Sequence, residues 1–297
     1  MQKTLFTIIL ILFTSCAFAQ DDLLDLLGED ETAVPETEYI KASFKTTRVI
    51  NAHSLENTAG GVLDIKISHR FGFLNGGLYE LFGLDQATIR IGGDYGITDW
   101  LMVGLGRSSF EKTYDGFVKF KLIRQSQGAK QIPITLAFAS NVAIKTLEWR
   151  NLDRENYFSS RLTFTHQFIL GRKFSESTTL QLMPTLVHRN LVEMTTEKND
   201  VLALGIAGRQ KLSKRIALNF EYYYVLPDQI LDKYTNSLSL GFDIETGGHV
   251  FQLHFTNSTS MIEKGFVTET VGNWLNGDIH FGFNVSRVFT VKKRKRK

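Results

Sequence analysis

The sequence is poor in cysteine and proline, and it has no long apolar run outside its first residues. It contains one cysteine, Cys16, and four prolines among 297 residues. A single cysteine excludes an internal disulfide and a cysteine-based metal cluster. No stretch after residue 13 approaches the roughly 18 consecutive apolar residues that a transmembrane helix requires. If this chain enters a membrane, it does so as strands.

The sequence also lacks a large excess of charge of either sign. The chain has 34 Lys and Arg against 31 Asp and Glu, a net charge of +3, which is too small to create a strong global field. The basic tail "KKRKRK" (292–297) resembles a nucleic-acid patch, but secretion argues against that use. We therefore predict no nucleic-acid partner, and we expect the tail to meet anionic head groups or an acidic partner in the periplasm.

The N-terminus predicts export. "MQK" supplies a positive charge, "TLFTIILILF" (4–13) is a short apolar run, and Ala17-Phe18-Ala19 fits the small-x-small cleavage rule. These features are typical of a Sec-type signal peptide over residues 1–19. The alternative is a lipid anchor on Cys16, which Phe13 disfavours because a smaller aliphatic residue is preferred there.

Four further segments follow the signal peptide. Residues 20–38 form an acidic leader, and residues 39–60 look strand-like but carry charge on both faces. A barrel is expected over 61–291, followed by the basic tail at 292–297. Within this segment, we expect 39–50 to be a periplasmic or lumenal strand outside the barrel wall.

Apolar and polar residues alternate with a period of two almost everywhere after residue 61. In "RIALNFEYYYVL" (215–226), the face from Ile216 to Leu226 is apolar, and the opposite face carries Glu221 at its middle. Such alternation predicts strands with one apolar face. The predicted strands are 62–71, 86–95, 100–107, 116–124, 131–140, 157–169, 178–188, 200–212, 215–226, 236–246, 249–257 and 277–290.

The length and spacing of these strands favour a membrane barrel over a soluble sandwich. Segments of about ten residues match a tilted strand that crosses a bilayer, and short and long connections alternate along the chain. We therefore predict an all-β fold, a transmembrane up-and-down antiparallel β-barrel of about 12 strands. The alternative has 14 strands, with a partner for 39–50 hidden in 51–60 or 258–276.

Several stretches resemble a known family. "FKTTRVINAHSLE", "GVLDIKISHRFG", "GLYELFGLDQATIRIGGDYGITDWLMVGLGRS" and "KTYDGFVKFKLIRQ" are similar to an uncharacterised outer-membrane β-barrel family of Bacteroidetes-type bacteria. The resemblance covers most of the mature chain and is most specific from His69 to Gln125. It implies a barrel in the outer membrane of a Gram-negative bacterium, and it implies no substrate and no catalytic residue.

The inward faces of the predicted strands carry charge. Two interpretations stay open, a weakly anion-preferring pore and a network of cross-strand ion pairs that braces the wall. Twelve strands lie between barrels filled by side chains and barrels with an aqueous channel, so strand number does not decide. The predicted lumen-facing charges are Lys66, Arg90, Lys119, Lys121, Arg161, Arg209, Lys211, Glu221 and Asp243.

Catalytic and metal motifs are weak. "NAHSLEN" (51–57) and "HFTNSTS" (254–260) each hold His, Ser and Asn, without a known catalytic spacing. His254 and His280 lie on neighbouring strands, but no third metal ligand accompanies them. We predict no enzyme activity, no cofactor and no metal, and an outer-membrane hydrolase is the least favoured alternative.

The sequence thus favours a small channel or porin-like transport barrel of unknown substrate. The main alternative is a closed structural or partner-binding barrel that uses its loops or its acidic leader. Expected partners are outer-membrane lipid, the barrel-assembly and periplasmic chaperone machinery, and a small anionic solute.

Overall fold

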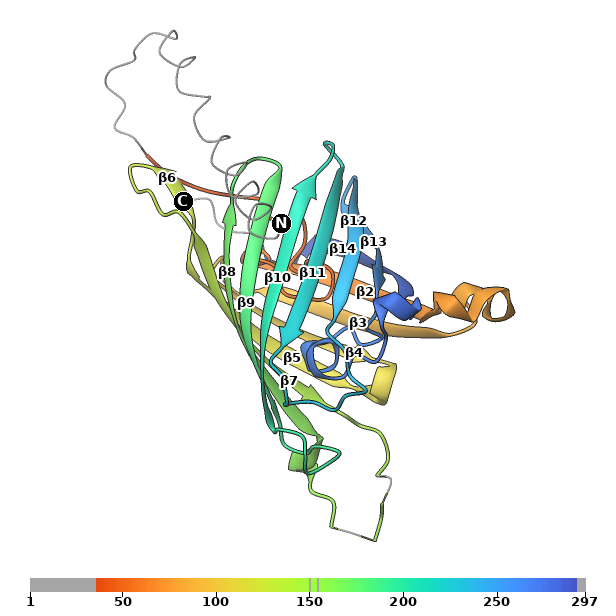
Figure 1. Ribbon diagram of the computed structural model, residues 1–297. Coiled ribbons are helices and arrows are strands. Elements are labelled where there is room, and N and C mark those ends of the chain that lie inside the picture. The colour runs from red at the N-terminus through yellow and green to blue at the C-terminus, as the bar shows by residue number, and fades with distance from the viewer. Residues whose placement is uncertain (1–35, 150, 154, 293–297) are drawn as a thin grey trace, which may run out of the picture. The chain divides into compact units, whose positions relative to one another are not determined.

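The computed structural model describes residues 36–149, 151–153 and 155–292, and its main element is a closed antiparallel barrel (Figure 1). Each strand pairs with its neighbours in chain order, and the last strand pairs with the first. The barrel strands are β2 (Val62–Phe73), β3 (Ala87–Gly96), β4 (Leu101–Ser108), β5 (Tyr114–Ile123), β7 (Thr135–Ile144), β8 (Leu162–Lys173), β9 (Thr178–Arg189), β10 (Asp200–Lys211), β11 (Ile216–Val225), β12 (Leu238–Thr246), β13 (His249–Thr256) and β14 (His280–Thr290).

These twelve strands confirm the predicted all-β barrel. The fourteen-strand alternative is wrong, because β14 closes the ring directly onto β2, with Asn284 opposite Ser68. Closure leaves no strand edge with unpaired backbone groups, as a spanning β structure requires. The predicted signal peptide (1–19), the leader up to residue 35 and the tail residues 293–297 lie outside the described residues.

The period of two sets the faces of each strand. Along β11, Ala217, Asn219, Glu221, Tyr223 and Val225 are buried, and every residue between them is half-buried or exposed. Successive side chains of a strand point to opposite faces, so the buried set is inside the barrel and the apolar set outside. The apolar face of 215–226 therefore lies on the outer wall of the barrel.

Connections alternate between two ends of the barrel. One end, the short-turn end, has turns such as 97–100, 174–177, 212–215 and 247–248, together with a small sheet in which β1 (Thr37–Tyr39) pairs with β6 (Ser126–Gly128). The other, the long-loop end, carries η1 (Leu74–Gly83), η2 (Phe110–Lys112), η3 (Phe158–Arg161), α2 (Glu263–Thr268) and η4 (Trp274–Asn276). No helix among the described residues is long and apolar enough to cross a membrane.

Residues 39–60 differ from the predicted strand. Only Thr37–Tyr39 is a strand, and residues 40–58, which we call the inner segment, are irregular chain with one bridge between Arg48 and His53. Charge on both faces makes this segment unsuited to a wall strand, which needs one apolar face. It is instead almost wholly buried from Ser43 to Leu55.

The strand predicted over 131–140 begins and ends four residues later, as β7. Gln125 to Ile134 are taken up by β6 and its turn, whose Ser126 bonds to Ile132. The predicted parity still holds, because Leu136 and Phe138 stay on the outer face and Ala137 and Ala139 are buried.

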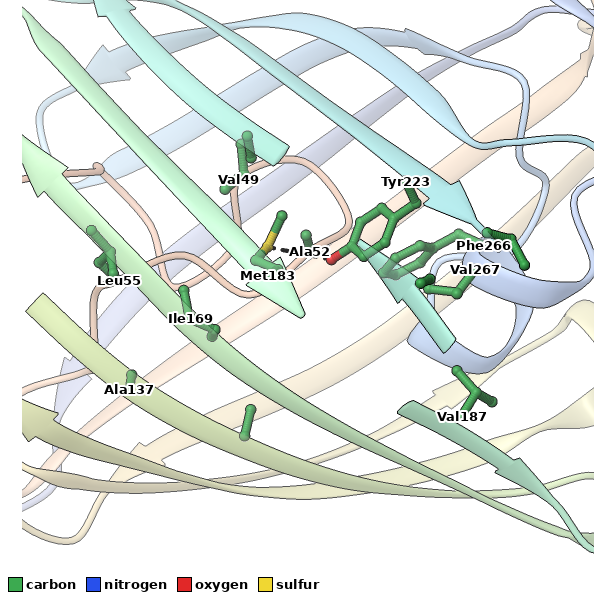
Figure 2. Packing of buried hydrophobic residues seen from close by; sticks show 14 of the residues in the cluster. Val49, Ala52, Leu55, Ala137, Ile169, Met183, Val187, Tyr223, Phe266 and Val267 are labelled. Carbon is green, nitrogen blue, oxygen red and sulfur yellow. Dashed lines mark hydrogen bonds between the residues drawn. The ribbon is translucent and has the colours of Figure 1, made fainter. Parts of the chain in front are cut away.

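An apolar cluster fills one side of the interior. The inner segment contributes Val49, Ala52 and Leu55, and α2 contributes Phe266 and Val267 (Figure 2). Wall residues of β7 to β11 complete it, among them Ala137, Ile169, Met183, Val187 and Tyr223. The cluster joins two segments that are far apart in sequence to the same part of the wall.

Candidate functional site

The inner segment lies within the lumen. It contacts side chains from nine different strands of the closed barrel, which is possible only for a chain that lies inside the ring. These wall partners are Lys66, Asp94, Lys119, Asn141, Gln181, Glu221, Ser239, Gln252 and Asn284. In Figure 1 the red-orange segment that follows β1 runs among the barrel strands accordingly.

Glu221 holds the tip of the inner segment. Its carboxylate accepts the backbone N–H groups of Ile50, Asn51 and Ala52 at 3.2, 3.0 and 3.0 Å, and the Asn51 amide at 2.8 Å. Arg70 Nη2 donates to Asn51 Oδ1 at 2.6 Å. An irregular segment has no ladder to satisfy its N–H groups, so one buried carboxylate takes that role.

Lys119 clamps the chain that follows the tip. Its fully buried ammonium donates to the carbonyls of Ser54 and Glu56, both at 2.6 Å. Lys121, on the same strand and face, lies 3.7 Å from the Glu56 carboxylate. The two lysines therefore fasten the inner segment rather than face an open channel.

Lys66 belongs to a second charged group on the wall. Its ammonium lies 2.6 Å from Asp94 and 3.0 Å from Asp64, and it also donates to the Thr47 hydroxyl. Thr47 in turn donates to Asp94 at 2.6 Å. This group ties the inner segment to β2 and β3 through charge-assisted hydrogen bonds.

Two further predicted charges are paired along the wall. Arg90 binds Asp115 through two parallel hydrogen bonds of 2.9 and 2.5 Å. Asp243 accepts a hydrogen bond from Gln252 at 2.7 Å, and the same Gln252 amide donates to the Val49 carbonyl at 2.6 Å. Asp243 thus supports a contact with the inner segment, whereas Arg90 joins β3 to β5 across β4.

The last three predicted charges lie apart from these contacts. Arg209 is buried near the short-turn end, with its Nε unpartnered among the described residues, and Lys211 is half-buried at the same end. Arg161 lies at the long-loop end, where its guanidinium stacks on Trp149, 3.9 Å from the ring centroid. The predicted set therefore divides between the lumen and the two barrel ends.

A second segment enters the lumen from the long-loop end. Residues 258–272, which we call the inserted loop, contain α2, and all six α2 residues are buried. Phe266 packs against Tyr223 with the ring centroids 5.2 Å apart. We did not predict this insertion. The available signal was an apolar group, Met261, Ile262, Phe266 and Val267, inside a connection that we took for a surface loop.

The two segments are joined to each other inside the barrel. Arg48 of the inner segment forms a buried ion pair with Glu263 of the inserted loop, and His53 Nε2 lies 3.4 Å from the same carboxylate. Burial, followed by the charges of Arg48 and Lys119, lowers the pKa of His53 well below its usual value, so the ring is neutral at pH 7. The ion pair therefore rests on Arg48 and Glu263.

The two His–Ser–Asn motifs do not assemble as catalytic pairs. The Ser54 hydroxyl donates to the Thr46 carbonyl, away from the His53 ring. Both ring nitrogens of His254 lack a hydrogen-bond partner within the described part of the chain, and His280 is held by Thr259 and the Phe71 carbonyl. No group of three or more His, Cys, Asp or Glu suited to a metal occurs among the described residues.

A charged latch fixes the inserted loop at the long-loop end. The Lys264 ammonium lies 2.7 Å from both Glu111 and Glu269, and Glu111 also accepts from Lys145. Burial acts to raise the pKa of Glu111, but the two lysines outweigh it and the pKa is lowered. For Lys264, burial acts to lower the pKa, yet Glu269 and Glu111 outweigh it and the pKa is raised.

These shifts predict acid release of the inserted loop. Because the pKa of Glu111 is lower in the folded protein, this carboxylate stabilises the fold fully at pH values above 4.5, its pKa in the unfolded chain. The stabilisation is lost as the pH falls through the lower pKa of the folded state. The Lys264 contribution is present below 10.5 and is lost only at higher pH. We expect hydrogen exchange over 258–272, corrected for intrinsic rates, to rise about fivefold or more under strong acid, as a loss of about 1 kcal/mol gives. Glu111→Gln should already exchange fast at neutral pH, and an unchanged profile in that variant would refute the latch.

A cavity of about 690 Å³ opens beside this latch. It lies among the long loops, and its lining includes Arg161, Trp149, Tyr234, Lys264 and Met194. By contrast, a cavity of about 10 Å³, room for about one water, lies beside the inner segment at Asn51 and Arg70. The long-loop end is hollow, and the middle of the lumen is filled.

Solved structures similar to this chain are membrane pores and barrels of low sequence identity. The NanC porin aligns with a TM-score of 0.48 at 7% identity, covering 77% of this chain and 98% of its own. An outer-membrane channel of Pseudomonas putida F1 aligns with a TM-score of 0.45 at 12% identity, covering 80% and 98%. Omp33 of Acinetobacter baumannii aligns with a TM-score of 0.40 at 8% identity, covering 76% and 97%. Among curated proteins, none matches.

One protein family does match, and its match spans the barrel and most of the inner segment. Residues 44–289 fit the family described as "Membrane bound beta barrel domain (DUF5777)". The match covers well over half of the chain and begins at Phe44, inside the lumen, so the inner segment belongs to the family's domain together with the wall. This chain is therefore a member of that family of membrane-bound β-barrel domains.

Proposed function

We propose that the protein is a gated, porin-like channel in the outer membrane of a Gram-negative bacterium. The inner segment and the inserted loop close its lumen in the resting state. Export through the Sec route, insertion by the barrel-assembly and periplasmic chaperone machinery, and contact with outer-membrane lipid belong to the same proposal. The observation that carries it is the polar attachment of the inner segment to the wall.

That attachment suits a gate better than a permanent core. Lys66, Asp94, Lys119 and Glu221 hold the inner segment through hydrogen bonds that water can replace once the segment leaves. A buried ion pair contributes little net stability compared with an apolar contact of the same volume, because desolvation offsets most of its attraction. The wall that remains would be charged and wettable, as a channel lining must be.

The second candidate is a closed barrel that serves as a scaffold. It is favoured by the apolar cluster of Val49, Leu55, Met183, Tyr223 and Phe266, which resembles an ordinary protein core. In that case the inner segment stays in place throughout the life of the protein. The two candidates make opposite predictions for a barrel from which the segment has been removed.

Conductance in a planar bilayer separates them. We expect the full chain to be silent at low voltage and a variant lacking residues 43–55 to give discrete openings. A salt gradient in the same experiment reads the ion selectivity that the retained wall charges give these openings. Heat-modified migration on SDS gels verifies that the variant is a folded barrel. A folded variant without openings would contradict the channel and favour the scaffold.

A further inference from the structure

Most charges around the loop-end cavity neutralise each other. Lys145 and Lys264 are paired with Glu111, and Lys264 is also paired with Glu269. Arg189 forms a further pair, in which its buried guanidinium lies 2.8 Å from the Glu197 carboxylate. Among the described lining residues, Arg161 and Glu148 remain as charges without an ion-pair partner.

Arg161 is the exception among the cationic groups of this cavity. Its Nη1 donates to the carbonyls of Lys145 and Leu147 at 2.9 and 2.5 Å, and its plane stacks on Trp149. No carboxylate of the residues that the structure describes lies within ion-pair distance of it. The contacts of Nη1 and the ring fix the guanidinium in one orientation without neutralising its charge.

The opposite edge of the guanidinium is open. Nε and Nη2 of Arg161 have no hydrogen-bond partner among the described residues, and neither is enclosed away from solvent. Because Arg161 lines the cavity, these donors are available there. Two parallel donors on a planar edge match the two oxygens of a carboxylate.

Apolar side chains line one part of the cavity. Leu191, Met194 and Val271 are each about half-exposed, and Phe110 and Tyr234 add aromatic surface. Polar side chains such as Asn151 and Ser160 line another part. Ligand sites in proteins combine apolar surface with placed polar groups that fix orientation, and about 300–1,000 Å³ is their usual size. The loop-end cavity, at about 690 Å³, is of that size and offers both kinds of surface.

We propose that the loop-end cavity binds a small organic carboxylate with an apolar or aromatic body. The carboxylate would take the Nε and Nη2 edge of Arg161, and the body would lie against Leu191, Met194 and Val271. This site rests on the proposed function only in its role, as the place where a channel would collect its solute. The binding chemistry itself depends on Arg161 and the cavity alone.

Calorimetric titration of the purified full chain in detergent tests this site, with phenylacetate as the probe and neutral phenylacetamide as its matched partner. We expect phenylacetate to bind and phenylacetamide to bind at least about tenfold more weakly, because it lacks the charge that pairs with the guanidinium. Arg161→Gln should lose phenylacetate binding by a similar factor. Arg124→Gln is the matched control, since Arg124 also stacks on an aromatic ring, 4.4 Å from Tyr39, outside the cavity.

A second variant is needed because Arg161→Gln could lose binding through a local change in the loop structure. Met194→Trp places a bulky ring where the apolar body of the ligand would lie and leaves Arg161 and its carbonyl contacts in place, so it should also weaken binding. Equal binding of phenylacetate and phenylacetamide, or unchanged binding in both variants, would overturn the carboxylate site. Absence of any binding to the folded wild type would do the same.

The outcome is independent of gating. If the variant lacking residues 43–55 conducts but phenylacetate does not bind, the channel stands and this site fails. If phenylacetate binds through Arg161 but no variant conducts, the site stands and the barrel is a binding protein rather than a channel.

Discussion

Glu221→Gln is expected to release the tip of the inner segment. Glutamine has the same size, but its amide nitrogen cannot accept the N–H groups that Ile50, Asn51 and Ala52 direct at the carboxylate. Each N–H left unpaired in a buried site costs about 1–3 kcal/mol, and the remaining amide oxygen keeps part of the contact. We expect the free energy that holds the tip in the lumen to fall by roughly 2–4 kcal/mol.

Two measurements follow this change. Hydrogen exchange over residues 44–55 should accelerate by about two orders of magnitude, which corresponds to about 2.8 kcal/mol. Channel openings in a planar bilayer should appear in the same variant. Glu245→Gln is the control, because Glu245 also pairs with the inner segment, through Lys45, but is 43% exposed. An exposed pair contributes about 0–1 kcal/mol, so a matching effect there would contradict the special role of Glu221.

Glu263→Gln is expected to uncouple the two lumen segments. It leaves the Arg48 guanidinium buried without its carboxylate, and removal of one partner from a buried pair costs about 3–5 kcal/mol. Because the pair lies between the segments, both the inner segment and the inserted loop should loosen together. Exchange should therefore rise over 44–55 and over 258–272 in this one variant.

The double variant Arg48→Met with Glu263→Leu separates coupling from general damage. Replacement of a buried ion pair by packed apolar residues is often neutral or stabilising, so the double variant should restore slow exchange and a silent lumen. Glu269→Gln removes a carboxylate from the inserted loop but leaves the Arg48–Glu263 ion pair intact. It should therefore raise hydrogen exchange in the inserted loop and leave exchange in the inner segment unchanged. If the double variant stays as loose as Glu263→Gln, the ion pair is not what joins the segments.

The wall of the barrel could be predicted from sequence because its signal is local. Each strand shows its faces within a few neighbouring residues, as in Ile216 to Val225, and every predicted strand has a counterpart among β2 to β14. Closure at twelve strands followed from counting these segments. The misplaced start of β7 has a local cause, since Ile132 and Ile134 continue the alternation of Leu136 and Phe138, but Ile132 bonds to Ser126 in a separate turn.

The contents of the lumen could not be predicted in the same way. The contact between Glu221 and Asn51 joins residues 170 positions apart, and its donors are backbone N–H groups of an irregular segment, which no residue pattern marks. One sequence feature of the inner segment was informative. Its charged residues lie on both faces, which excluded it from the barrel wall. The inserted loop carried another, an apolar group around Phe266, but its length suggested an outer loop.

The candidate cavity was predictable only in part. Arg161 was among the predicted inward charges, but its free edge depends on Trp149 and on two loop carbonyls. Likewise, Lys119 was assigned to a pore lining from its parity alone. Its two carbonyl partners, Ser54 and Glu56, could be identified only once the inner segment was placed.

The inner segment also bears on how the barrel is assembled. Asn284 on the last strand binds Ile50, and Arg70 on the first strand binds Asn51, so the same tip spans the seam where the ring closes. Contacts between residues 234 positions apart are slow to form, because the loop entropy is lost before any contact repays it. A tip that binds both strands holds the two ends of the barrel together at this seam. The segment that occupies the lumen of the finished barrel thus also joins its first and last strands.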